Sequence, residues 1–367
     1  MKTLHRKYDD NGELVEEIVG DDPRELDFRG EEEPMTMARR GAILASIGAR
    51  VSEHEAKVVA ERNAAFETFL RYGREGLSEE QRAQAVGSDS AGGSLTPEVF
   101  STVFTESLKQ HDELFDVATL VTTERGTEFG FPLDDDTSAV ATIVAENAES
   151  TTASPVVFGN TAFARCPMWR SGHIIASMEL AADSAFPLST VLATLFGARF
   201  ARGVGAQFVT NLIADATVGV TSASPTALTA DELLDLIASV DPAYSQRGSF
   251  LMNVTVLTAL RKLKASTGGS FLLPFGRDAN GRTTLFDHTV YMSPSMAGIE
   301  ALAKPIAFGD LSRFIRRQVR NSLTVKTYNE KYATSGQIGW EAFLRVDGKL
   351  AKAASAPVPI RVLACHS

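Results

Sequence analysis

Cysteine is almost absent from this 367-residue chain, which contains only Cys166 and Cys365. Two cysteines provide no disulfide framework, and without a CxxC pair the usual zinc-binding signature is missing. The six histidines are scattered along the chain without the spacing of metal ligands. We therefore expect a protein that folds in a reducing, cytoplasmic environment and holds no metal ion.

Long apolar runs and catalytic motifs are missing as well. No uninterrupted apolar stretch approaches the length of a membrane span, and the N-terminus has no apolar core of signal-peptide length. The sequence contains no HExxH, Walker A, GxSxG or GxGxxG pattern. Asp134-Asp135-Asp136 lacks the spaced ligands and glycine of a calcium loop, so we expect a solvated turn there. These absences predict no membrane association, no enzyme activity and no cofactor.

Charge is plentiful but unevenly distributed. The chain has 36 basic and 46 acidic residues, a net charge of −10, which disfavours tight wrapping of duplex DNA because that binding needs Lys and Arg to neutralise phosphates. Residues 1–86 hold 13 basic and 19 acidic residues, whereas residues 87–367 hold 23 and 27. The net charges are −6 and −4, so the much shorter first segment carries the larger charge. This difference in charge density indicates two physically different parts.

The first part reads as a charged, helical leader. Residues 1–34 are turn-prone and acidic, and we expect them to be mobile. Residues 36–72 contain no proline and predict an amphipathic helix or a pair of them, with these apolar residues at helical spacing: Leu44, Ile47, Val51, Val58, Val59, Phe66 and Leu70. Such a segment is either a peripheral helical subdomain or a detachable assembly domain. Residues 86–94 form a flexible linker, and Val86, Gly87, Ser88 and Asp89 are candidates for proteolytic processing.

The second part mixes helices with strands. A short helix is expected over 98–109, with Val99, Val103, Phe104 and Leu108 on one side. Extended stretches at 129–133 and 156–178, the second broken by Pro167, predict a long hairpin. Residues 188–213 predict a helix of roughly 26 residues, and at about 1.5 Å per residue it is long for a small domain.

Shorter elements follow the long helix. A capping box at Thr229–Glu232 starts another helix, and 255–264 is also helical. Strands are expected at 250–252, 289–292, 323–328 and 343–346, with a turn at Asp347-Gly348. The fold class is therefore α+β.

Four arginines, Arg313, Arg316, Arg317 and Arg320, form the strongest cationic cluster in the sequence. Mixed with apolar residues, they suit either contact with nucleic acid or a subunit interface. His173 is expected to be a structural or interface histidine. Glu146 and Glu149 are expected to be solvated carboxylates rather than a catalytic pair.

Five short stretches, in this order, resemble the major capsid protein of tailed phages with the Hong Kong 97 type fold. They are SDSAGGSLTPE at 88–98, AENA at 145–148, SMELAADS at 177–184, FGDLS at 308–312 and LRVDGK at 344–349. The resemblance covers roughly residues 87–363.

The resemblance implies a division of the chain into named parts. It implies a scaffolding-like segment at 1–86, an N-arm at 87–120, an extended loop at 121–178, a peripheral domain with the spine helix at 179–222, an axial domain at 223–322 and peripheral terminal strands at 323–367. Family members often remove the first segment by proteolysis during maturation.

The implied function is structural. Copies of the chain would form pentamers and hexamers of an icosahedral shell, assembled in the host cytoplasm, that encloses double-stranded DNA with weak, non-specific contact. A portal and a maturation protease are the implied partners, and Glu146, Glu149 and the four arginines are candidate contacts between subunits. An encapsulin-like compartment for enzyme cargo and a soluble hydrolase are the alternatives.

One property of the family is not expected here. Its cross-linking variant needs a lysine on the extended loop, and this chain has none between Lys109 and Lys262. We therefore expect a shell without that isopeptide bond.

Overall fold

The computed structural model describes most of the chain. The residues it describes are 3–8, 14–20, 57–73, 76–79, 96–135, 157–183, 187–264, 271–352 and 357–367. The chain divides into two compact units, Met1–Ala60 and Glu61–Ser367. Among the described residues no helix is both long and apolar enough to cross a membrane.

The smaller unit contains a hairpin where the sequence indicated only turn-prone chain. Strand β1 (Thr3–Tyr8) pairs antiparallel with β2 (Leu14–Gly20), and Leu4 lies opposite Val19 in the register. The connection contains Asn11-Gly12, a dipeptide that favours tight hairpin turns. The high charge density obscured this signal in the sequence.

Helical structure in the leader is confirmed for residues 57–72, while the predicted stretch 36–56 lies outside the described residues. Phe66 and Leu70 are buried as expected, whereas Val58 and Val59 are exposed. Gly73 follows the helix with φ 72° and donates its N–H to the carbonyl of Phe69. A glycine in this left-handed conformation is a common helix terminator.

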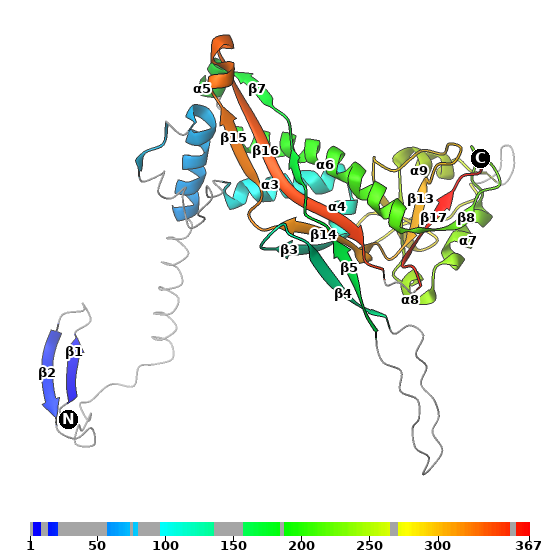
Figure 1. Ribbon diagram of the computed structural model, residues 1–367, viewed down its shortest axis with the longest axis horizontal. Helices are drawn as coiled ribbons and strands as arrows, with labels where there is room; N and C mark the ends of the chain where they lie inside the picture. The colour runs from blue at the N-terminus through cyan, green and yellow to red at the C-terminus, as the bar shows by residue number, and fades with distance from the viewer. Residues whose placement is uncertain are drawn as a thin grey trace. The chain divides into compact units, whose positions relative to one another are not determined.

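The first core of the larger unit lies between two helices and a sheet (Figure 1). Helix α3 (Glu98–His111) packs along α6 (Leu188–Asp215), the predicted long helix, which has 28 residues. The buried face of α3 carries Phe100, Phe104 and Leu108. The prediction was wrong for Val99, which is 49% exposed, because the apolar face is rotated toward Phe100.

Glycine allows the close approach of elements to α6. A Cβ on Gly197 would lie 2.5 Å from the Cβ of Ser107, and one on Gly205 would lie 2.4 Å from an Asp112 carboxylate oxygen. These distances are shorter than real side-chain contacts. Gly203, in contrast, has only the Trp169 ring nearby, at 3.8 Å.

A six-stranded sheet covers this helix pair. Its strands are β3 (Thr119–Thr123), β6 (Met168–Arg170), β7 (Ile174–Ser177), β14 (Phe314–Val319), β15 (Thr324–Tyr328) and β16 (Gln337–Leu350). The turn predicted at Asp347-Gly348 is wrong, since β16 continues through it. Gly348 serves close packing instead, because a Cβ there would lie 2.7 Å from the rings of Phe208 and Phe314.

A second core surrounds a seven-stranded sheet. Its strand order is β10 (Phe275–Arg277), β11 (Thr283–Leu285), β12 (His288–Met292), β9 (Ser249–Met252), β13 (Ile306–Gly309), β17 (Ile360–Ala364) and β8 (Thr217–Thr221). Helices α7 (Ala230–Ser239), α8 (Pro242–Ser245) and α9 (Val254–Arg261) accompany it. The capping box of Thr229 and Glu232 and the strands at 250–252 and 289–292 are confirmed. Strand β17 lies in this sheet, not with the terminal strands of the first.

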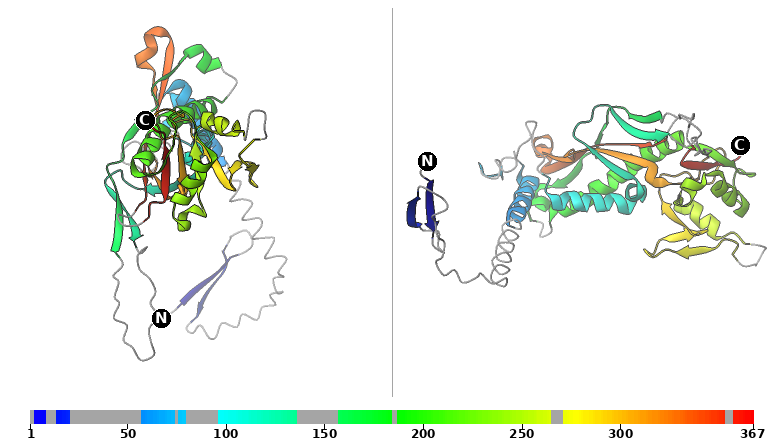
Figure 2. Two further views of the ribbon diagram at one scale, coloured as in Figure 1. Left: turned by 90° about the vertical axis from the view of Figure 1, so that its right-hand side faces the viewer. Right: turned by 90° about the horizontal axis from the view of Figure 1, so that it is seen from below.

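The predicted hairpin is present at its base. Strand β4 (Phe129–Asp135) pairs antiparallel with β5 (Val157–Phe163), and the pair extends away from the body in two views (Figures 1 and 2). The second extended stretch is not one strand, because after Pro167 the chain continues as β6 and β7, which pair with β16. Short helices α4 (Leu114–Val117) and α5 (Met178–Asp183) and 3-10 turns at Leu311–Arg313 and Glu330–Ser335 complete the unit.

Candidate functional site

The cationic cluster lies on and beside strand β14: Arg316 and Arg317 lie within the strand, and Arg313 and Arg320 lie just before and after it. Arg316 and Arg317 are 5% and 1% exposed. Both side chains are buried within the subunit because β14 is an inner strand covered on both faces. Their role as contacts between subunits stays a prediction. Arg313 and Arg320 keep exposed side chains, at 49% and 64%. Arg313 lies 3.9 Å from Asp310, and Arg320 forms an exposed ion pair with Glu124 at 2.9 Å.

Arg317 holds the base of the β4–β5 hairpin to the sheet. Its guanidinium donates to the carbonyls of Ala164 at 3.1 Å, Arg125 at 2.9 Å and Thr127 at 2.5 Å, and to the hydroxyl of Thr123 at 3.2 Å. The planar group also lies 5.4 Å from the ring centroid of Phe129. One buried side chain thus joins β14, β3 and both ends of the hairpin.

Arg316 is buried without a carboxylate in contact among the described residues. Its guanidinium lies 5.7 Å from the ring centroid of Phe115, and its Nε has no hydrogen-bond partner there. Burial lowers the pKa of this group, against the opposing effect of Asp116. The ring face is the cation's main partner in the subunit.

The other candidates from the sequence lie outside the described residues. These are Glu146 and Glu149 in the hairpin connection and the processing linker Val86, Gly87, Ser88 and Asp89. Their roles remain predictions.

A broad, open cavity of about 710 Å³ lies at the hairpin base. Its lining residues are Glu124, Arg125, Gly126, Thr127, Glu128, Arg165, Val319 and Arg345. The Arg345 guanidinium donates hydrogen bonds to the carbonyls of Gly126 and Cys166, at 3.4 and 3.1 Å. The mixed charges and the absence of a nucleophile with an adjacent base suit contact with another protein surface better than chemistry on a small molecule.

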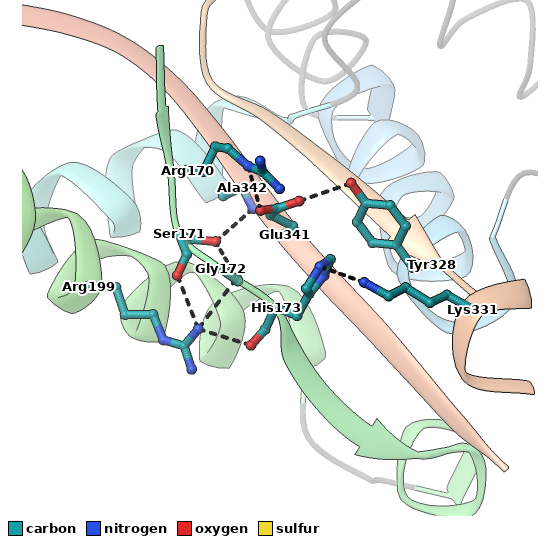
Figure 3. A network of polar contacts seen from close by, with 9 residues as sticks. All are labelled: Arg170, Ser171, Gly172, His173, Arg199, Tyr328, Lys331, Glu341 and Ala342. Carbon is teal, nitrogen blue, oxygen red and sulfur yellow. Dashed lines mark hydrogen bonds and ion pairs between the residues drawn. The ribbon is translucent and has the colours of Figure 1, made fainter. Parts of the chain in front are cut away.

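Glu341 is at the centre of a polar network on β16 (Figure 3). It is 1% exposed and accepts hydrogen bonds from Arg170 at 3.0 Å and from the Tyr328 hydroxyl at 2.9 Å. Burial would raise the pKa of this carboxyl, but the two hydrogen bonds outweigh burial and hold the pKa below its usual value. The fully paired carboxylate fixes β6 and β15 to either side of β16.

His173 extends the same network (Figure 3). Its ring meets the rings of Tyr328 and Tyr332 edge-on, at 4.9 and 5.8 Å, and its Nε2 lies 3.3 Å from the Nζ of Lys331. Arg199 of α6 donates to the His173 carbonyl at 3.1 Å. The contacts within the chain favour the structural role that the sequence allowed.

Asp112 is a buried carboxylate that sequence reasoning missed. It is 2% exposed and accepts from the N–H of Leu114 at 3.0 Å and from the Ser293 hydroxyl at 2.9 Å. Burial raises its pKa to about 6. The side chain connects the end of α3 to residues beyond β12, so it lies where the two cores meet. A lone Asp after a helix carries no sequence signal for this role.

These side chains serve architecture. Within the described part of the chain no group of three or more His, Cys, Asp or Glu residues is placed to hold a metal ion. The cations and carboxylates described above tie strands, helices and a projecting hairpin together. These contacts point to a structural role for the side chains described above.

The chain matches the phage capsid family model over residues 92–359 and belongs to that family. Its α+β fold is the predicted Hong Kong 97 type, and it is a structural capsid protein.

Two solved capsids have the same fold at low identity, and a further phage chain is similar over a comparable length. The capsid of a native GTA particle is 22% identical, with 72% of this chain and 91% of that chain covered and a TM-score of 0.52. The capsid of an empty GTA particle is also 22% identical, with 72% and 90% covered and a TM-score of 0.56. A chain from Microbacterium phage Oxtober96 is 16% identical, with 70% and 91% covered and a TM-score of 0.48. No curated protein matches the chain.

Proposed function

We propose that copies of this chain assemble into pentamers and hexamers of an icosahedral shell that encloses double-stranded DNA. The observation that carries the proposal is the capsid-family match across 92–359. Exposed apolar side chains on β7 and on α5, which directly follows it, support association between copies. They are Ile175, Met178 and Leu180.

The charge of the chain suits a container. A net charge of −10 opposes tight binding along the length of DNA, so the contents would be held by enclosure rather than by affinity. The exposed Arg313 and Arg320, with Glu146 and Glu149 of the hairpin connection, are the residues we propose for contacts between copies. Assembly in the host cytoplasm and a portal as partner complete the proposal.

We also propose that residues 1–86 assist assembly and that a maturation protease cuts the chain near Val86–Asp89. The high charge density of this leader and the flexible composition of 86–94 support both roles. A chain that lacks 1–86 should form disordered aggregates or no shells. Regular shells from that truncated chain would contradict the assembly role.

The decisive experiment is electron microscopy of the expressed full chain, combined with sequencing of the N-terminus in assembled particles. Closed shells of uniform size are expected, and particles from phage-producing cells should contain DNA. Enzyme cargo in place of nucleic acid would favour the compartment alternative. A small monomer with no particles under any assembly condition would overturn the proposal.

A further inference from the structure

The helix at 57–72 presents a continuous apolar face to the body of the larger unit. Ala65, Phe66, Phe69 and Leu70 are 5%, 1%, 6% and 0% exposed, and Leu77 beyond the helix is 4% exposed. The spacing of one, three and four residues places these side chains along one stripe. They belong to the same core as Phe100, Leu188, Leu192 and Trp340.

Hydrogen bonds fasten the end of this helix to three separate elements. The indole Nε1 of Trp340 donates to the Leu70 carbonyl at 2.8 Å, and the Asn329 amide donates to the Tyr72 carbonyl at 3.3 Å. Arg71 donates to the Ala181 carbonyl at 2.8 Å. The first two bonds satisfy carbonyls that the end of this helix otherwise leaves unpaired. All three have partners more than a hundred residues away in sequence.

Glu67 completes the start of the long helix α6. Pro187 occupies the N-cap position and provides no capping side chain. The Glu67 carboxylate instead accepts from the N–H of Ser189 at 3.0 Å and from the Ser189 hydroxyl. A carboxylate at a helix N-terminus accepts a hydrogen bond from a free backbone N–H and is attracted by the partial positive charge at that end of the helix. The helix at 57–72 therefore supplies a part that α6 lacks.

We propose that α3, the start of α6 and β16 form a helix-binding surface whose partner is the segment 61–79 of this chain, and that this surface retains the segment after the chain is cut at 86–94. The mode is an amphipathic helix in a groove, with anchors at 66, 69 and 70. A helix this short is marginal in water, so its order depends on the surface. The inference goes beyond the proposed function, because it rests on contacts within one subunit.

The test uses unassembled full chain with a site-specific protease sequence inserted between Gly92 and Gly93. After cleavage under native conditions, the N-terminal fragment should elute with the body on size exclusion, with both masses present in one peak. Separation of the wild-type fragment from the body would overturn the proposal.

Two substitutions on the same helix supply the comparison. Leu70→Asp places a carboxylate at a position 0% exposed, and Val59→Asp places one at a position 39% exposed. The first should release the cut fragment, whereas the second should leave it bound. Equal retention of both variants would contradict the assigned surface.

Hydrogen exchange of the uncut chain gives an answer that does not depend on cleavage. Amides of 61–72 should be protected in the wild type and in Val59→Asp, and should exchange at least about 10-fold faster in Leu70→Asp, since a buried unpaired carboxylate opposes docking. Unprotected wild-type amides would overturn the proposal. Shell formation is measured separately, so either proposal can fail alone.

Discussion

At the scale of single residues, a buried charged side chain can join several backbone segments by hydrogen bonds, which apolar side chains cannot do. Arg317 reaches four oxygen acceptors from one position on β14. Fixed guanidinium geometry suits this bridging, because a lysine ammonium cannot span acceptors on several segments. Arg317 therefore makes more of the hydrogen bonds at the base of the projecting hairpin than Arg345, which reaches two carbonyls there.

Replacing Arg317 should loosen that base. Arg317→Met leaves three carbonyls without their donor, and we expect a loss of about 3 kcal/mol of stability. Urea unfolding would measure the loss, and limited proteolysis should cut near 127–130 faster. The matched control is Arg320→Met, whose exposed pair with Glu124 should contribute no more than about 1 kcal/mol. Equal effects of the two substitutions would contradict the bridging role.

Asp112 should make stability depend on pH. Its pKa is raised from 3.8 in the unfolded chain to about 6 in the fold, so the folded state binds the proton more tightly and stability falls as the pH rises from about 4 to 7. At 1.36 kcal/mol per pH unit, that difference corresponds to at most about 3 kcal/mol.

Asp112→Asn keeps the size of the side chain and removes the titration. The difference in unfolding free energy between variant and wild type should therefore move in favour of the variant from pH 4 to pH 7, in denaturant titrations at each pH. A constant difference over that range would contradict the assignment.

At the scale of elements, close packing decides where glycine is required. Gly205→Ala would place a Cβ against Asp112, and we expect a loss of about 1–3 kcal/mol despite the better helix propensity of alanine. Gly203→Ala lies two residues away on the same helix, where a Cβ would make only an ordinary contact with the Trp169 ring at 3.8 Å, and it should gain up to about 1 kcal/mol. Thermal unfolding distinguishes the two variants. A gain in stability from both would show that Asp112 can move away from a Cβ at position 205 at little cost.

Periodicity explains what was predictable at this scale. Short-range sequence patterns mark the long helix, the capping box and the hairpin base. Side chains two residues apart share a strand face and those four apart share a helix face, so the pattern lies within one element. Gly348 shows the limit, since Asp347-Gly348 looks like a turn locally and only the rings of Phe208 and Phe314 explain the glycine. The buried positions of Arg316, Arg317 and Asp112 likewise depend on partners far away in sequence.

At the scale of the whole molecule, the composition of the hairpin limits how copies are joined. With no lysine between Lys109 and Lys262, this segment has no amine for an isopeptide bond. Purified particles boiled in detergent should therefore migrate as single subunits on denaturing gels. A ladder of covalent multimers would contradict this expectation.

The order of the strands in the two sheets has a consequence for synthesis. Strand β17 lies between β13 and β8 in the seven-stranded sheet. In the other sheet β3 pairs with β14, which follows it by almost two hundred residues. Contacts this distant in sequence form late during folding. A ribosome must therefore synthesise β16 before the six-stranded sheet is complete and β17 before the seven-stranded sheet is complete. We expect polypeptides interrupted before these strands to associate poorly with other copies.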